Sequence, residues 1–239
     1  MGESSGECSS AGGLDPRIAT GLTLLARRRR SMLESGEKQV GWKVGFGSPS
    51  GLALLELDAP VIGFIVDSGG ADIARPLPVS GWTAPVVECE IAALVARDIP
   101  AGVDPADVGR YVESWAPAFE FADIDSPPRD VAEVLSGNIF HRAYAIGEHR
   151  AEALADVAQW EAEVDVDGEC QHIADPAALT GDVSEVIART AALAPMLGRC
   201  VLAGDVILTG SIVAPIPVRS GATVAYRLSD LPEMTVSIA

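Results

Sequence analysis

Short apolar segments separated by glycine, proline and aspartate run through most of this chain of 239 residues, and they limit its fold more than any other feature. Helical periodicity is confined to 15–30, which ends in the basic block Arg27–Arg30, to 107–114 and to 182–197, the longest, where Asp182 or Ser184 is the expected N-cap. This pattern predicts an all-β or mixed roll and argues against alternating strands and helices. The segments lie at 40–46, 61–66, 86–95, 118–122, 143–146, 163–166, 206–209, 223–228 and 234–238.

Composition narrows the class of protein further. A hydrophobic content of 48% is ample for a core, and a net charge of −17 argues against nucleic acid and anionic membranes as partners. No apolar run reaches the roughly 18 residues of a membrane span, and no signal peptide is indicated. The four cysteines are scattered, which is typical of a reduced, cytoplasmic protein. We expect a disordered tail at 1–14, which is small and polar, and one domain at 15–239.

Two glutamates separated by one residue stand in the apolar segment at 85–94. Side chains two apart on a strand share a face, so Glu88 and Glu90 point the same way, while Val87, Cys89 and Ile91 point the other way. Adjacent like charges repel one another, which favours a cation between them. The alternative is a solvated strand face, which is the usual setting of such a pair.

A third carboxylate strengthens the metal hypothesis. Glu120 lies between Phe119 and Phe121, so the two aromatic rings are expected on one face of a strand and the carboxylate on the other. Three carboxylates from two strands form an all-oxygen site that suits Mg²⁺ or Mn²⁺. We therefore expect Glu88, Glu90 and Glu120 to bind a metal ion.

Several motifs follow one another in a recognisable order. Together they resemble the fumarylacetoacetate hydrolase superfamily over roughly 15–239, and most closely its branch of 2-hydroxypenta-2,4-dienoate hydratases and 4-oxalocrotonate decarboxylases. The resemblance implies an α+β fold, a mixed β-roll with a few peripheral helices. The motifs are GWKVGF at 41–46, APVIGFIVD at 59–67, VECEIAALVARDIP at 87–100, PAFE at 117–120, GNIFHRAYAIG at 137–147 and AGDVILTGSIVAPIPVRSGATV at 203–224.

The resemblance also suggests residues for the chemistry. Lys43 lies in an apolar strand, where an unpaired ammonium is unfavourable, and Asp67 at the end of the next strand is its expected partner. We expect this pair to relay protons, with a structural ion pair as the alternative. Asn138, Thr209 and Gly210 are the expected substrate-binding residues, although each also suits a turn. The three histidines carry no predicted role, and His141 is the one nearest to a motif.

Two segments expected to lie near the substrate depart from the family pattern. The family's Arg beyond the third ligand is replaced by Ala122-Asp123-Ile124-Asp125, and the stretch before the long helix reads Ala177-Ala178-Leu179-Thr180-Gly181-Asp182. The candidate metal ligands thus follow the family pattern, while the segments expected to contact the substrate are altered.

The resemblance implies a Mg²⁺- or Mn²⁺-dependent hydratase that adds water to a 2-hydroxy-2,4-dienoate, a 2-oxo acid in its enol form. A 2-oxo acid decarboxylase on the same site is the first alternative. A repurposed scaffold is the second, as a non-catalytic partner of a decarboxylase or as a cyclase or isomerase for a bulkier ligand. The absence of histidine before His141 argues against a C–C hydrolase. We expect a homo-oligomer, and a complex with a decarboxylase remains open.

Overall fold

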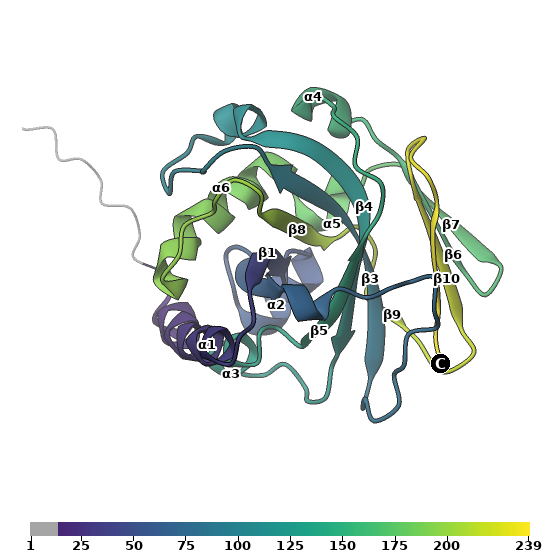
Figure 1. The fold of residues 1–239 in the computed structure, drawn as a ribbon, viewed down its shortest axis with the longest axis horizontal. Coiled ribbons are helices and arrows are strands. Elements are labelled where there is room, and N and C mark those ends of the chain that lie inside the picture. Colours follow the sequence, from purple (N-terminus) through teal and green to yellow (C-terminus); the bar gives the residue numbers. More distant parts are fainter. Residues whose placement is uncertain (1–13) are drawn as a thin grey trace, which may run out of the picture.

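Two β-sheets and a set of peripheral helices form the computed structural model, which describes residues 14–239. A seven-stranded sheet has the order β2-β1-β8-β3-β4-β5, with the short strand β9 paired to β3. Its strands are β1 (Gln39–Gly45), β2 (Val61–Val66), β3 (Pro85–Val95), β4 (Val112–Asp123), β5 (His141–Ile146), β8 (Val206–Ser211) and β9 (Ile216–Pro217). This sheet is mixed, because β1 and β8 run parallel while its other pairs are antiparallel. It curls through the middle of the molecule (Figure 1).

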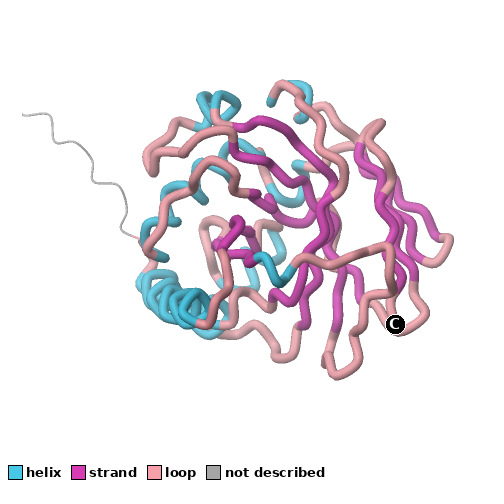
Figure 2. The backbone as a smooth tube through the Cα atoms, viewed as in Figure 1, coloured by secondary structure: helices cyan, strands magenta, loops and turns pink. Residues whose placement is uncertain are grey.

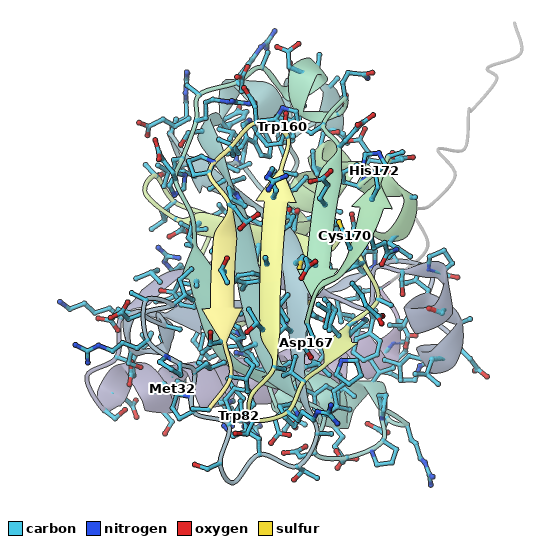
Figure 3. All side chains as sticks on the ribbon, turned by 90° about the vertical axis from the view of Figure 1, so that its right-hand side faces the viewer. Met32, Trp82, Trp160, Asp167, Cys170 and His172 are labelled. Atoms are coloured by element: carbon cyan, nitrogen blue, oxygen red, sulfur yellow. The ribbon has the colours of Figure 1, made fainter. Side chains whose placement is uncertain are left out.

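A smaller, four-stranded antiparallel sheet packs against one side of the curled sheet (Figure 2). It has the order β11-β10-β6-β7, and the ring centroids of Tyr226 on β10 and Phe119 on β4 lie 6.0 Å apart. The strands are β6 (Ala162–Val166), β7 (Glu169–Ile173), β10 (Thr223–Leu228) and β11 (Met234–Ser237). Figure 3 views this sheet from outside, with the exposed residues Cys170 and His172 on its edge strand β7.

The helices lie around the two sheets. The long helices α1 and α6, with α3, lie on the side away from the four-stranded sheet, while α2 lies beside β1 (Figure 1). They are α1 (Pro16–Glu34), α2 (Pro49–Leu55), α3 (Val131–Ser136), α4 (Leu154–Val157), α5 (Ala177–Thr180) and α6 (Val183–Leu193). Three 3₁₀ turns complete the set, namely η1 (Asp67–Gly69), η2 (Pro105–Arg110) and η3 (Ala194–Leu197). The architecture is the α+β mixed roll with peripheral helices that the sequence predicts.

Two helix predictions are wrong. The first helix does not end at Arg27–Arg30 but continues to Glu34, since arginine is a good helix former and buried Arg29 is held by hydrogen bonds to Gln39 and to the Leu197 carbonyl. It is therefore longer than α6. The predicted helix at 107–114 is instead the short turn η2 followed by β4, because the chain from Val112 pairs with β3.

The expectation about the N-cap is confirmed, whereas the one about the tail falls almost wholly outside the described residues. Asp182 caps α6, since its carboxylate accepts a hydrogen bond from the Ser184 N–H. The predicted tail 1–14 lies outside the described residues except for Leu14, which is partly buried against the core. Among residues 14–239, no helix combines the length and apolarity needed to cross a membrane.

Candidate metal centre

The strand alternation of β3 places its carboxylates and its core residues on opposite faces. Val87, Cys89 and Ile91 are buried in the main core, as the spacing predicts. On β4, Phe119 and Phe121 are likewise fully buried, and Glu120 points to the other side. The antiparallel register sets Glu120 directly opposite Glu88. One face of two paired strands therefore carries all three glutamates.

The three carboxylates converge as the sequence predicts. One oxygen from each of Glu88, Glu90 and Glu120 lies within 4.8 Å of the other two. Glu90 and Glu120 are completely buried, whereas Glu88 is half-buried and lines a pocket. Burial and the charge of Glu120 raise the pKa of Glu88 to about 7, and the same two causes, with Glu88, raise the pKa of Glu90 well above its usual value.

Lys43 supplies the positive charge beside this cluster. Its ammonium is buried and donates hydrogen bonds to Glu120 Oε1 and, over 3.2 Å, to the carbonyl of Ile139. Although burial opposes the charged form, the nearby carboxylates, above all Glu120, raise the pKa of Lys43. Burial also opposes ionisation of Glu120, but Lys43 and a hydrogen bond from His141 lower its pKa. Lys43 and Glu120 therefore form a charged, buried pair.

Two buried carboxylate oxygens of the cluster have no hydrogen-bond partner. Oε1 of Glu90 and Oε2 of Glu120 are buried and unpaired, whereas the other oxygen of each residue is bonded to a donor. Buried polar atoms are rarely left unsatisfied, and a clustered set of anionic oxygens needs a cation. The donor set, which contains only carboxylate oxygens, fits a hard divalent ion such as Mg²⁺ or Mn²⁺.

The predicted ion pair between Lys43 and Asp67 is wrong. Lys43 faces Gly63 across the β1–β2 ladder, while Asp67 lies beyond the end of β2, where Val66 faces Gln39. The exposed Asp67 carboxylate instead accepts hydrogen bonds from the backbone N–H groups of Lys38 and Ser68, at 3.0 and 3.1 Å. Asp67 therefore has no part in the chemistry proposed below.

The two residues predicted at the end of β8 are engaged within the protein. The hydroxyl of Thr209 donates to the Ile91 carbonyl over 2.8 Å. The N–H of Gly210 donates over 2.8 Å to Oε2 of Glu90. Gly210 has a φ of +98°, which a residue with a side chain rarely adopts. The geometry thus gives Gly210 the task of fixing a candidate metal ligand.

Asn138 is likewise bonded to the backbone. Its side-chain oxygen accepts from the N–H of Phe64 at 3.0 Å, and its side-chain nitrogen donates to the Phe64 carbonyl at 2.8 Å. Asn138, Ile139 and Phe140 all have positive φ, between 54° and 60°, which is uncommon for three successive residues with side chains. This segment presents the Ile139 carbonyl to Lys43.

His141 is a site residue for which the sequence predicts no role. Its Nδ1 lies 3.0 Å from Oε1 of Glu120, and its Nε2 is buried without a partner. The ring also stacks on Tyr144, with centroids 6.3 Å apart. The signal that could have found it is the pairing of β5 with β4, which places His141 opposite Ala122 and near Glu120, but pairing partners cannot be read from periodicity.

A pocket of about 490 Å³ leads to this cluster. Lys43 and Glu88 line it together with residues of β1, α2, β3, α5 and the ends of β4 and β8. Its volume falls within the range of roughly 300–1,000 Å³ that is usual for small-molecule sites. The carboxylate cluster can thus be reached by a small ligand.

The family model described as the fumarylacetoacetate (FAA) hydrolase C-terminal domain matches residues 65–239. The chain therefore belongs to the fumarylacetoacetate hydrolase family. It is 27% identical over 210 residues to a 4-oxalocrotonate decarboxylase from Pseudomonas sp., a match that covers 86% of this chain and 80% of the relative. It is 29% identical over 195 residues to a 2-hydroxyhexa-2,4-dienoate hydratase from Comamonas testosteroni, which covers 78% and 73%.

The overall fold also resembles that of a solved relative. The solved structure of the 4-oxalocrotonate decarboxylase from Pseudomonas putida G7, complexed with magnesium and adipate, superposes with a TM-score of 0.84 at 23% identity, covering 93% of this chain and 86% of that one. The two chains share the mixed roll with its curled sheet.

Proposed function

We propose that this chain is a divalent-metal-dependent lyase that adds water to a 2-hydroxy-2,4-dienoate to give a 4-hydroxy-2-oxo acid. The observation that carries the proposal is the cluster of three glutamates, two of them with unpaired buried oxygens, beside Lys43 at the inner end of a pocket. The named hydratase and decarboxylase relatives and the magnesium in the related solved structure support it.

In this proposal Glu88, Glu90 and Glu120 hold Mg²⁺ or Mn²⁺. The bound cation would supply a Lewis acid for the carboxylate and the 2-oxygen of the substrate. The N–H of Gly210 orients Glu90, and Lys43 with His141 orients Glu120, so two of the three ligands are fixed before a metal arrives.

Lys43 is proposed as a hydrogen-bond donor rather than a base. Its pKa is raised, so the ammonium keeps its proton, and two of its three N–H bonds are directed at Glu120 and Ile139. The third is available to a substrate carboxylate or to the water that is added, because Lys43 also lines the pocket. Thr209 and Asn138 contribute by holding the strands and the loop around the cluster.

Decarboxylation of a 2-oxo acid is the second candidate function, and the 4-oxalocrotonate decarboxylase at 27% identity favours it. Both reactions build up negative charge on the same 2-oxygen, so one arrangement of charges serves either. A scaffold without metal is disfavoured, because the single ammonium of Lys43 would be left to offset the repulsion among three clustered carboxylates.

The test follows the ultraviolet absorbance of 2-hydroxypenta-2,4-dienoate with purified protein, with Mg²⁺ and with EDTA. We expect the dienol band to decay only with metal and the product to be the hydrated 2-oxo acid. The variants Glu88→Ala and Glu120→Ala should lose both activity and Mg²⁺ binding. Decay that EDTA and both variants leave unchanged would contradict the proposal, and release of carbon dioxide from a 2-oxo-enedioate would favour the decarboxylase.

We further propose, from the family resemblance, that the protein is cytoplasmic, forms a homo-oligomer and acts on a small-molecule acid. A complex with a decarboxylase is the alternative assembly. The unpaired outer edge of β7, where 169–172 are exposed, supports contacts between copies. Light scattering during size-exclusion chromatography would give the molar mass of the assembly, and a monomer at micromolar concentration would contradict the homo-oligomer.

A further inference from the structure

We propose that the acid bound at this site has an apolar tail, and that the pocket discriminates against tails that end in a second carboxylate. The inference rests on the proposed function and deepens it, since it names the part of the substrate that extends away from the metal centre.

The walls of the pocket beyond the metal centre are apolar. The buried Lys43 and the half-buried Glu88 mark the inner end of the pocket, and the exposed Ser50 and Leu54 of α2 mark its opening. Leu54 of α2 is 59% exposed although it lines the pocket, so a bound tail would cover an apolar side chain that water now reaches. The apolar walls include Val86, Ile124, Ile139, Phe140, Leu179 and Val213.

Among the described residues that line this pocket, Lys43 is the one cation. Its ammonium is at the inner end and is bonded to Glu120 and to the Ile139 carbonyl. A second carboxylate at the far end of a substrate would therefore leave water without meeting a positive charge, which is unfavourable. The net charge of −17 adds to this penalty.

The hydroxyl groups of the walls offer little compensation. Ser211 donates to the Val213 carbonyl over 2.7 Å. Ser48 and Ser50 share a hydrogen bond of 3.2 Å, which leaves one hydroxyl proton of that pair for a ligand. The hydroxyl of Thr180, which also lines the pocket, donates to the Gly181 carbonyl over 3.4 Å. Neutral hydroxyl donors do not replace an ion pair.

Arginines do lie nearby, but they line a different hollow of about 280 Å³. Phe140 is the one residue common to the two linings and so separates them. Arg142, one of three arginines in that hollow, is bonded to Asp125 at 2.9 Å and to Asp123 at 3.4 Å. The other two are Arg28 and Arg129. Positive charge is thus placed behind the wall of the pocket and not inside it.

The experiment compares two unreactive acids of equal length, 2-oxohexanoate and 2-oxoadipate, which differ in a terminal methyl or carboxylate. Calorimetric titration into the Mg²⁺-loaded full chain should show tighter binding of 2-oxohexanoate, by on the order of 100-fold. EDTA should abolish binding of both acids. Equal or tighter binding of 2-oxoadipate would overturn the inference, and so would binding of neither acid.

Two variants place a cation in the pocket wall. Ile124→Arg and Leu179→Arg, on different elements, should each move the preference toward 2-oxoadipate by about 10-fold or more. Both positions are half-buried, so an arginine there can extend toward the opening. Leu24→Arg, at an exposed position of α1 outside the pocket, is the matched control and should leave the preference unchanged. An unchanged preference in both folded pocket variants would overturn the inference.

Turnover separates this inference from the proposed function. The assay compares the turnover of 2-hydroxy-2,4-dienoates that carry methyl, propyl or carboxylate tails. We expect kcat/KM to rise about 4-fold for each added methylene that the pocket buries. Metal-dependent binding of 2-oxohexanoate with no dienoate consumed would support the tail inference and contradict the hydratase. Preferred consumption of the carboxylate-tailed dienoate would support the hydratase and contradict the tail inference.

Discussion

Lys43 decides how much negative charge the cluster can hold before a metal binds. One ammonium is bonded to Glu120, and its field also reaches Glu88 and Glu90. It lowers the pKa of all three carboxyls, but only that of Glu120 ends below its usual value. The metal-free site therefore has one firmly ionised carboxylate and two carboxyls, Glu88 and Glu90, that lose their protons at higher pH than an ordinary glutamate.

Substitution of Lys43 by methionine tests this arrangement. Lys43→Met removes the ammonium from buried Glu120 and leaves His141 as its only bonded side chain, so the free energy of unfolding in EDTA should fall by about 3–5 kcal/mol. The double variant Lys43→Met/Glu120→Gln removes the stranded charge and should recover a large part of that loss, measured by urea unfolding at pH 8. If the two single changes were simply additive in the double variant, the buried ion pair would be contradicted.

The loop between α3 and β5 joins the two edges of the curled sheet. Asn138, just before the edge strand β5, bonds both backbone groups of Phe64 on the opposite edge strand β2. Two glycines make room for this loop. A Cβ on Gly63 would lie 2.5 Å from Asn138 Oδ1, and a Cβ on Gly45 would lie 2.7 Å from Ile139 Cγ2. Gly45 of the motif at 41–46 and Gly63 of the motif at 59–67 are thus explained by the close approach of the motif at 137–147.

Gly63→Ala should therefore disturb the roll and the site together. The added methyl pushes on Asn138 and, at 3.0 Å, on Cγ of Lys43, and we expect a loss of about 1–3 kcal/mol in the free energy of unfolding, together with a lower kcat. Gly102→Ala is the matched control, because a Cβ there meets nothing within 4 Å. The close packing would be contradicted if both variants unfolded at the same denaturant concentration.

Alternation within one strand could be predicted, whereas contacts between strands could not. The period of two placed Glu88, Glu90 and Glu120 away from the core and was sufficient for the metal hypothesis. The partner of Lys43 depends on strand register and sheet order, which the sequence pattern does not contain. The strand ends of the sequence therefore predict Asp67 as its partner, whereas in the fold the partner is Glu120. His141 was missed for the same reason. Strand β7 was missed because its residues are exposed and polar, which leaves no apolar pattern.

At the scale of the whole molecule, the cluster links stability to metal and to pH. The folded, metal-free chain keeps protons on carboxyls that would be ionised in the unfolded chain, because burial raises the pKa of Glu88 to about 7 and raises that of Glu90 well above its usual value. Between the unfolded value near 4.5 and about 7 the folded state binds more protons, so the contribution of Glu88 to stability falls as pH rises through that window. A divalent ion replaces these protons and reverses the penalty.

The gain in melting temperature from Mn²⁺ or Mg²⁺ over EDTA should consequently grow as pH rises from 5.5 to 8. At 100 times the dissociation constant, binding adds about 2.7 kcal/mol, and for a chain of this length that corresponds to about 5–10 °C. The melting temperatures with metal and with EDTA are compared at the same pH, so that the general repulsion within a chain of charge −17 affects both samples alike. In Glu88→Gln the gain should be small at every pH, while the EDTA form at pH 8 should melt above the EDTA form of the unsubstituted chain, because one repelling carboxylate is gone. A gain that did not change with pH, or one that Glu88→Gln retained in full, would mean that metal and protons do not compete for these carboxylates.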